Sequence, residues 1–97
     1  MSVIVLLEVQ AKPESLDELK ATLEAILPDT RAYDGFEDIQ VVANQDDPCN
    51  LILVEKWKSR QHQEKYFGWR AETGALDALG AMLSQPPSVR YYDDLGL

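Results

Sequence analysis

The sequence has little of the residues that most often bind metals or form covalent intermediates. Its 97 residues include one cysteine, Cys49, and one histidine, His62. A single cysteine cannot form an intrachain disulfide, and a reactive thiolate would need a basic neighbour that the turn-like segment Asp46–Asn50 does not supply. His62 has no second histidine or cysteine at ligand spacing. The sequence therefore predicts neither a metal centre nor a cysteine nucleophile.

Basic residues are also scarce. The nine lysines and arginines are outnumbered by seventeen aspartates and glutamates, which gives a net charge of -8. Such a surface repels phosphate backbones and anionic lipid headgroups, so neither a nucleic acid nor a membrane is an expected partner. The sequence also lacks a glycine-rich loop of the kind that binds nucleotide phosphates. By itself, the acidity indicates only good solubility.

Long apolar runs and a signal-peptide pattern are missing as well. The apolar stretch Val3–Leu7 is far too short to cross a bilayer, and no basic segment or small-residue cleavage site accompanies it. We therefore expect a cytoplasmic protein. With 45% hydrophobic and 27% charged residues, the chain has the composition of one soluble globular domain over residues 1–97.

Four segments have the apolar patterns that are typical of β-strands. They are Ser2–Gln10, Phe36–Ala43, Leu51–Trp57 and Ser88–Asp93. The first and third carry apolar residues on both sides of the strand, as strands with two buried faces do. The turn-rich residues 44–50 predict a hairpin between the second and third strands.

A first helix is predicted between the first two strands. Pro13 at a first-turn position begins it. Its apolar stripe consists of Leu16, Leu19, Leu23 and Ile26. Pro28 either interrupts this helix or begins a short second one, and the Asp34-Gly35 turn ends the helical region before the second strand.

Two further helices are predicted between the third and fourth strands. Ser59 has a side-chain oxygen that can cap a helix over Arg60–Arg70. Gly74 marks a break before another short helix, Ala75–Leu83. Pro86-Pro87 prevents that helix from continuing into the last strand.

The resulting order, β-α-β-β-α-β, predicts an α+β fold of the ferredoxin-like class, with an antiparallel sheet and helices packed on one face. The other face of the sheet would stay uncovered. Because Val3–Leu7 and Leu51–Val54 are apolar on both sides, that face would be costly to expose in a monomer. Pairing of two sheets face to face would cover it, so we expect a homodimer.

The junction between the third strand and the following helix holds the candidate catalytic residues. Trp57 ends the apolar strand, and His62, Tyr66 and Trp69 recur at helical spacing beyond it. These rings would either wall a pocket for a flat aromatic ligand or pack as ordinary core. Tyr66 could donate a hydrogen bond to a substrate oxygen. His62 could accept a phenolic proton or remain a solvated first-turn residue.

The candidate substrate-binding residues are Trp57, Phe67, Trp69 and Arg70. Phe67 and Trp69 would contact a ligand or only fill the core. Arg70 would pair with a substrate oxyanion or form an exposed salt bridge with a nearby glutamate. Glu8 and Glu55 stand in otherwise apolar strands, so an inward-facing one would need a partner and would be a candidate acid or base.

Three short motifs, taken in order, resemble the antibiotic biosynthesis monooxygenase family. They are Thr30-Arg31-x-x-x-Gly35-Phe36, Val54-Glu55-x-Trp57-x-Ser59, and Pro86-Pro87 before Tyr91-Tyr92. The resemblance covers nearly the whole chain. It implies a dimeric α/β barrel with a cavity between sheet and helices. It also implies oxidation of phenols or quinols by molecular oxygen without metal, flavin or other cofactor.

The chain departs from this family pattern on the helix after Trp57. Many relatives carry a histidine nine or ten residues after the strand tryptophan, where this sequence has Tyr66 and Phe67, and His62 lies only five residues on. Haem-degrading relatives also use an asparagine that the first strand lacks. The resemblance thus favours a quinol monooxygenase-like enzyme. A non-catalytic dimeric module that binds or senses a small ligand is the alternative, and a haem-degrading relative is a third possibility.

The dimer is open to a direct test. Two apolar sheet faces should associate at micromolar concentration, so light scattering should give about twice the chain mass of 10.9 kDa. A mass of 10.9 kDa under those conditions would contradict the expectation.

Overall fold

The computed structural model describes residues 2–97. Along the chain the elements are β1 (Val3–Gln10), the 3-10 turn η1 (Pro13–Ser15), α1 (Leu16–Arg31), β2 (Phe36–Ala43), β3 (Asn50–Trp57), α2 (Arg60–Glu72), α3 (Ala75–Ala81) and β4 (Ser88–Asp93). The four predicted strands are thus confirmed to within one residue at each end.

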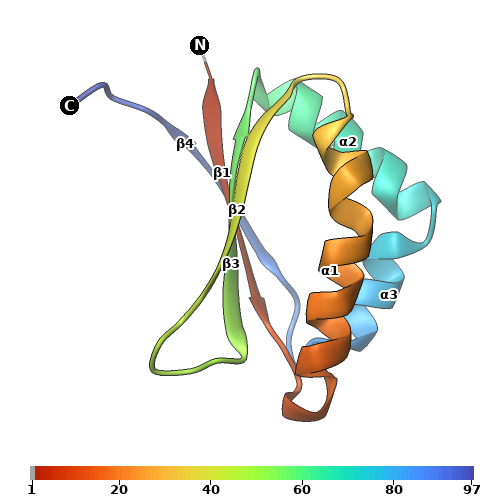
Figure 1. The fold of residues 1–97 in the computed structure, drawn as a ribbon. Helices are drawn as coiled ribbons and strands as arrows, with labels where there is room; N and C mark the ends of the chain where they lie inside the picture. Colours follow the sequence, from red (N-terminus) through yellow and green to blue (C-terminus); the bar gives the residue numbers. More distant parts are fainter. Residues whose placement is uncertain (1) are drawn as a thin grey trace.

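Within residues 2–97, the strands form one antiparallel sheet in the order β2-β3-β1-β4. The central strand β1 pairs with β3 on one side and with β4 on the other. The three helices lie together on one side of this sheet (Figure 1). This arrangement confirms the predicted α+β, ferredoxin-like fold.

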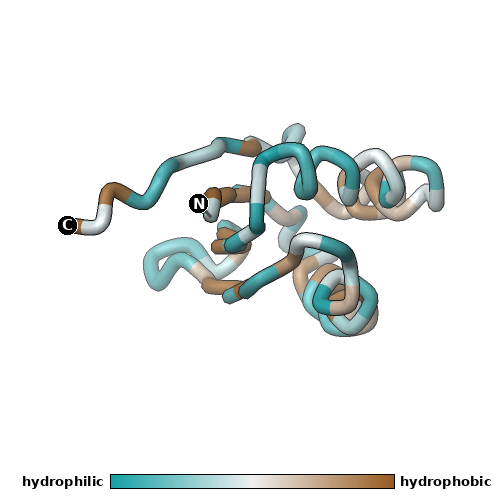
Figure 2. The backbone as a smooth tube through the Cα atoms, turned by 90° about the horizontal axis from the view of Figure 1, so that it is seen from above, coloured by the Kyte–Doolittle hydropathy of each residue, from teal (hydrophilic) through white to brown (hydrophobic). Residues whose placement is uncertain are grey.

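Burial follows the alternation of the strand sequences. On β1, Val3, Val5, Leu7 and Val9 are buried under the helices, whereas the residues between them are only half-buried. β3 repeats the pattern, because every second residue from Leu51 to Trp57 is buried. Seen from above, the tube near the N-terminus is mainly apolar, while the helices alternate between apolar and polar turns (Figure 2). The sheet therefore presents its more apolar face to the helices.

Helix α1 differs from its prediction at both ends. Pro13 begins the 3-10 turn η1, and the α-helix starts only at Leu16. The expectation that Pro28 interrupts the helix or begins another is wrong, because α1 continues through it to Arg31. A proline at this position leaves only the Glu24 carbonyl without its helical donor. Glu24 and Pro28 are exposed, so water can satisfy that carbonyl.

Helix α2 begins as predicted but presents a different face to the sheet. The His62 backbone N–H donates to Ser59 Oγ at 3.2 Å, which confirms the cap. The buried residues of α2 are Gln63, Tyr66 and Arg70. Of the predicted stripe, Tyr66 is buried and Trp69 packs half-buried against the same aromatic core, whereas His62 is half-buried, in keeping with the alternative of a first-turn residue near solvent.

The break between the last two helices lies where it was expected. Gly74 has a φ of 83°, in the left-handed region that favours glycine, and it immediately precedes α3. Helix α3 ends at Ala81, two residues before the predicted Leu83. Leu83 is instead buried and forms an isolated bridge to Ala11. Within residues 2–97, no helix combines the length and the apolarity needed to cross a bilayer.

Gly35 should be intolerant of a side chain. Its φ is +85°, and a Cβ placed on it would overlap the His62 side chain. Gly35→Ala is therefore expected to lower the free energy of unfolding by about 1–3 kcal/mol, as measured by urea denaturation. Gly68→Ala is the matched control, because Gly68 lies inside α2 with open space around it. It should stabilise the domain by about 0.5–1 kcal/mol. Equal effects of both changes would contradict this account of the turn.

Candidate functional site

A small cavity lies between the sheet and the helices. Its open volume is about 30 Å³, enough for about one water molecule. Apolar side chains form most of the wall, among them Leu7, Leu23, Leu53, Leu76 and Leu79. Four polar side chains complete it, namely Thr30, Glu55, Tyr66 and Arg70. An apolar cavity with a few convergent polar groups is the common form of a small-molecule site, so we treat it as the candidate site.

Glu55 is the only carboxylate that the described residues place in the cavity wall. It is 3% exposed and lies on the inward face of β3, two residues before Trp57. Side chains two apart on a strand point to the same face, and the Trp57 Nε1–H donates to Glu55 Oε1 at 2.8 Å. Burial raises the pKa of Glu55 to about 7, although the hydrogen bond from Trp57 acts in the opposite direction. Near neutral pH, Glu55 can therefore both accept and release a proton.

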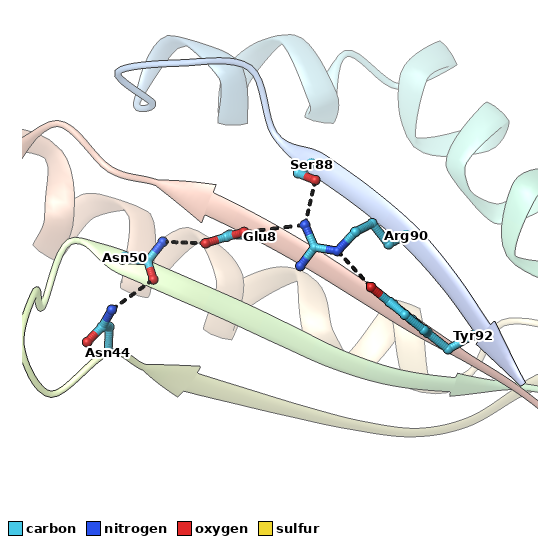
Figure 3. A network of polar contacts seen from close by, with 6 residues as sticks. All are labelled: Glu8, Asn44, Asn50, Ser88, Arg90 and Tyr92. Atoms are coloured by element: carbon cyan, nitrogen blue, oxygen red, sulfur yellow. Dashed lines mark hydrogen bonds and ion pairs between the residues drawn. The ribbon is translucent and has the colours of Figure 1, made fainter. Parts of the chain in front are cut away.

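Glu8, the other candidate among the strand glutamates, lies on the opposite face of the sheet. The Asn50 Nδ2 donates to Glu8 Oε2 at 3.0 Å, and the Arg90 Nη1 lies 3.4 Å from Oε1 (Figure 3). The hydrogen bond from Asn50, with smaller effects of Arg90, lowers the pKa of Glu8. Glu8 thus stays ionised in a polar network away from the cavity, and it is no longer a candidate acid or base for this site.

Tyr66 and Arg70 lie one turn apart on α2, and both form hydrogen bonds with residues of α1. The Arg70 Nε–H donates to the Tyr66 hydroxyl oxygen at 2.8 Å, and the Tyr66 and Thr30 hydroxyls are 2.6 Å apart. The Arg70 Nη2 donates to the Ile26 carbonyl oxygen at 2.8 Å and to Thr30 Oγ1 at 3.2 Å. The exposed salt bridge considered for Arg70 is therefore wrong, because Arg70 is 5% exposed. The Tyr66 hydroxyl is already hydrogen-bonded within the protein.

Aromatic rings close one end of this region. The Trp57 ring is fully buried, and its centroid lies 5.1 Å from that of Tyr66. Phe36 meets Trp57 edge to face at 5.5 Å, and Tyr33 stacks on Trp69 at 5.4 Å. The structure thus brings the predicted pair Trp57 and Tyr66 together on the helix side of the sheet. Trp69 covers the cluster from its half-exposed position.

His62 lies outside the cavity wall. Its Nδ1 is 2.6 Å from Ser59 Oγ, and its Nε2 is 3.8 Å from an Asp34 carboxylate oxygen. The side chain is 30% exposed and packs against Gly35. Phe67, in contrast, lines the cavity and packs against both parts of the core. Of His62 and Tyr66, only Tyr66 therefore borders the cavity, together with the strand candidate Glu55.

Three residues near the site were not among the sequence candidates. Thr30 reaches Tyr66 from the last turn of α1, and Tyr33 enters the aromatic cluster from the following turn. Gln63 is fully buried beside them, and its Oε1 accepts a hydrogen bond from Tyr91. Gln63, Tyr66 and Arg70 follow the helical spacing i, i+3 and i+7, so a periodicity that included polar residues could have found Gln63.

The cavity wall contains one acidic and one basic side chain, Glu55 and Arg70. Glu55 offers a carboxyl that changes its charge near neutral pH, and Arg70 offers a permanent positive charge. In the part of the chain that the structure describes, no three histidine, cysteine, aspartate or glutamate side chains gather closely enough to hold a metal ion.

Comparison with known proteins gives a consistent result. The model of the family described as "Antibiotic biosynthesis monooxygenase" matches residues 2–78. Rv0793 from Mycobacterium tuberculosis is 25% identical, with a TM-score of 0.85 over 98% of this chain and 96% of its own. A conserved protein from Methanosarcina mazei Go1 is 19% identical, with a TM-score of 0.88 over 97% and 93%. A structure described as an antibiotic biosynthesis monooxygenase is also 19% identical, with a TM-score of 0.86 over 96% and 98%. No curated protein matches the chain.

The burial of Glu55 should make stability depend on pH. Because its pKa is raised from 4.5 to about 7, the folded state binds more protons than the unfolded state between these values. Glu55 should therefore cost stability as the pH rises from 4.5 through 7, by about 3 kcal/mol in total. Urea denaturation between pH 4.5 and 8 should show that Glu55→Gln removes this loss.

Glu64→Gln is the control for that series. Glu64 is a half-exposed glutamate of α2 that pairs with Arg60 at 3.5 Å, so its removal should leave the pH dependence almost unchanged. A Glu55→Gln profile parallel to that of the wild type would contradict the assignment.

Proposed function

Because the chain belongs to the antibiotic biosynthesis monooxygenase family, we propose that it oxidises a phenolic or quinol-like small molecule with molecular oxygen. One observation of this structure supports the proposal in addition to family membership. The cavity between sheet and helices contains a buried carboxyl, Glu55, whose pKa of about 7 suits it to take a phenolic proton. The apolar wall around Glu55 suits an aromatic ring.

The proposed reaction uses the substrate as its own reductant. Glu55 accepts the proton of a phenolic hydroxyl, and the phenolate passes one electron to molecular oxygen. The resulting superoxide and aryloxyl radical join at a ring carbon, and the peroxide takes back the proton held by Glu55 to become a hydroperoxide. The same carbon then loses its C–H proton as the O–O bond breaks, so that one oxygen stays on the carbon as a carbonyl and the other leaves as hydroxide, which takes that proton to form water. With hydroquinone as the substrate, one quinol and one oxygen molecule give one hydroxybenzoquinone and one water.

The protein contributes a base and a dry site in this scheme. General-base help of this kind is worth roughly 10²–10⁴ in rate. The hydrogen bond from the Trp57 Nε1 orients the Glu55 carboxylate, and the aromatic cluster around Trp57 excludes water from that end. No metal, flavin or haem takes part in the reaction as we propose it.

We propose that Glu55, and not His62, acts as the base. The His62 ring nitrogens face Ser59 and Asp34, outside the cavity, whereas the Glu55 carboxyl lines it. Tyr66 keeps a role in the wall, where its ring contacts the ligand while its hydroxyl holds Arg70 and Thr30. Trp57 and Phe67 would complete the binding surface, with Trp69 behind Tyr66.

A substrate needs more room than the cavity offers. A second cavity of about 80 Å³ lies beside it under α3, and the two share Leu7, Phe67, Leu76 and Leu79 as wall residues. Rotation of Phe67, or displacement of the short helix α3, would join the two spaces. Helix α3 contains no buried residue and follows the hinge-like Gly74. Ligand entry under α3 is therefore part of the proposal.

We also propose that the active form is a cytoplasmic homodimer. The sheet face away from the helices carries partly exposed Ile4, Leu6, Ile52 and Val54 across β1 and β3. Val42 and Tyr92 extend this surface on the edge strands and are exposed. A second copy seated on this face would cover these apolar groups.

A binding module without catalysis is the second candidate. The observation that favours it is that the Tyr66 hydroxyl is already hydrogen-bonded to Arg70 and Thr30, which leaves Glu55 as the single candidate acid or base among the described residues of the cavity wall. A module of this kind would bind the same aromatic compounds without consuming oxygen.

Oxygen uptake by metal-free protein should distinguish the two candidates. With hydroquinone and anthrone-like phenols, the wild type should consume oxygen faster than the uncatalysed reaction, and Glu55→Gln should lower kcat by roughly 10²-fold or more. Glu64→Gln and His62→Ala should retain most of the activity, because both side chains lie outside the cavity wall. Tight binding with no oxygen uptake above background for any compound would replace the enzyme with the binding module.

A further inference from the structure

Arg70 brings a buried positive charge to the cavity without an acidic partner. Its side chain is 5% exposed, and it lines the cavity wall. Its hydrogen-bond acceptors are all neutral, namely the Tyr66 hydroxyl, the Ile26 carbonyl and the Thr30 hydroxyl. Among residues 2–97, no aspartate or glutamate lies within ion-pair distance of it.

A buried arginine without an acidic partner is unusual, especially in a chain that is rich in acidic residues. Buried arginines are normally paired, because moving a charge out of water is costly unless an opposite charge compensates it. The sequence has seventeen acidic residues, yet none of those described is used here. The guanidinium lies 4.6 Å from the Trp69 ring centre and 5.3 Å from that of Tyr66. Such cation–π contacts stabilise the charge but do not neutralise it.

The Arg70 guanidinium also has one nitrogen that donates no hydrogen bond to the described residues. Nε and Nη2 donate the three hydrogen bonds to α1 and Tyr66, whereas Nη1 has no acceptor among the described residues. A guanidinium held by two of its nitrogens is fixed in orientation, and the third can bind an incoming oxyanion without much loss of side-chain entropy.

Glu55, the acidic side chain of the cavity wall, does not neutralise the charge of Arg70. Glu55 takes its hydrogen bond from Trp57 and makes no ion pair with Arg70. No carboxylate is paired with the Arg70 guanidinium among the described residues, so its charge is uncompensated by direct contact. A ligand with one negative charge would compensate it, and a neutral ligand of the same shape would not.

We propose that the cavity binds an aromatic carboxylate, whose carboxylate pairs with Arg70 while a hydroxyl on the ring faces Glu55. The unpaired positive charge of Arg70 is the reason for choosing an anionic ligand. The place of the hydroxyl rests on the function proposed above, in which Glu55 takes the phenolic proton. The substrate class is thereby narrowed from phenols and quinols in general to hydroxylated aromatic acids.

A matched pair of ligands tests this inference directly. 2,5-Dihydroxybenzoate and 2,5-dihydroxybenzamide have nearly the same shape and differ by one negative charge. Quenching of the fluorescence of Trp57 and Trp69, which lie beside Tyr66, should give a Kd at least tenfold lower for the acid. In Arg70→Gln this preference should fall below twofold. In Arg70→Lys part of it should remain, because the charge is kept but the fork is lost.

Arg60→Gln is the control for the arginine variants. Arg60 is exposed on the same helix and pairs with Glu64, so its loss should leave the preference unchanged. Arg70 also joins α2 to α1, and its variants could lose stability for that reason alone. The wild-type comparison of acid and amide does not depend on those variants. Equal affinities for the two compounds, or no binding of either, would overturn the inference.

Oxygen uptake separates a failure of this inference from a failure of the proposed function. Selective binding of the acid without oxygen uptake would leave the anion site standing and remove the monooxygenase. Oxidation of hydroquinone and of the benzamide as readily as the benzoate, with equal affinities, would leave the monooxygenase standing and overturn the anion site. Preferential binding and oxidation of the benzoate would support both.

Discussion

The removal of Glu55 from water is the constraint on which the site depends. A carboxyl with 3% exposure and a single hydrogen bond from Trp57 cannot be solvated as an ion in the usual way, so its pKa rises to about 7. Trp57 is itself fully buried by Phe36 and Tyr66. The aromatic cluster thus has two effects, since it contributes apolar burial to the core and also keeps water from the carboxyl. A change that loosened the cluster would return Glu55 to an ordinary surface pKa.

The two faces of the sheet give two strand glutamates opposite properties. Glu55 points toward the helices, where burial dominates and the pKa rises. Glu8 points away from them, where Asn50 and Arg90 stabilise the ionised form and the pKa falls (Figure 3). Glu55 therefore lines the cavity, and Glu8 belongs to a polar network on the outer face of the sheet. The side of the sheet, more than the residue type, decides which glutamate can exchange protons near neutral pH.

The strands and the fold class could be predicted from the sequence, whereas the inward face of α2 could not. Strand burial has a period of two, so the sequence divides Val3–Gln10 into two sets of side chains, and the structure shows which set faces the helices. The aromatic spacing on α2 pointed to Tyr66 and Trp69, which do pack in the core, but it gave no sign that Gln63 and Arg70 are buried as well. Arg70 is tolerated there because it donates hydrogen bonds to α1, whereas Gln63 accepts one from Tyr91 of β4 and keeps its Nε2 without a partner among the described residues. Such partners are distant in the sequence, and no local pattern reveals them.

The same long-range hydrogen bonds hold the part of α2 where the resemblance to the family leads us to expect a histidine. Tyr66 stands at one of the two positions where that histidine is expected, and its hydroxyl accepts from Arg70 and lies against Thr30. The three side chains form one unit, since removing the hydroxyl would leave Arg70 Nε buried without an acceptor. A histidine in place of Tyr66 would therefore disturb Arg70 and Thr30 together. In the function proposed above, the acid–base role therefore belongs to the strand residue Glu55, which lines the cavity and whose pKa is raised to about 7.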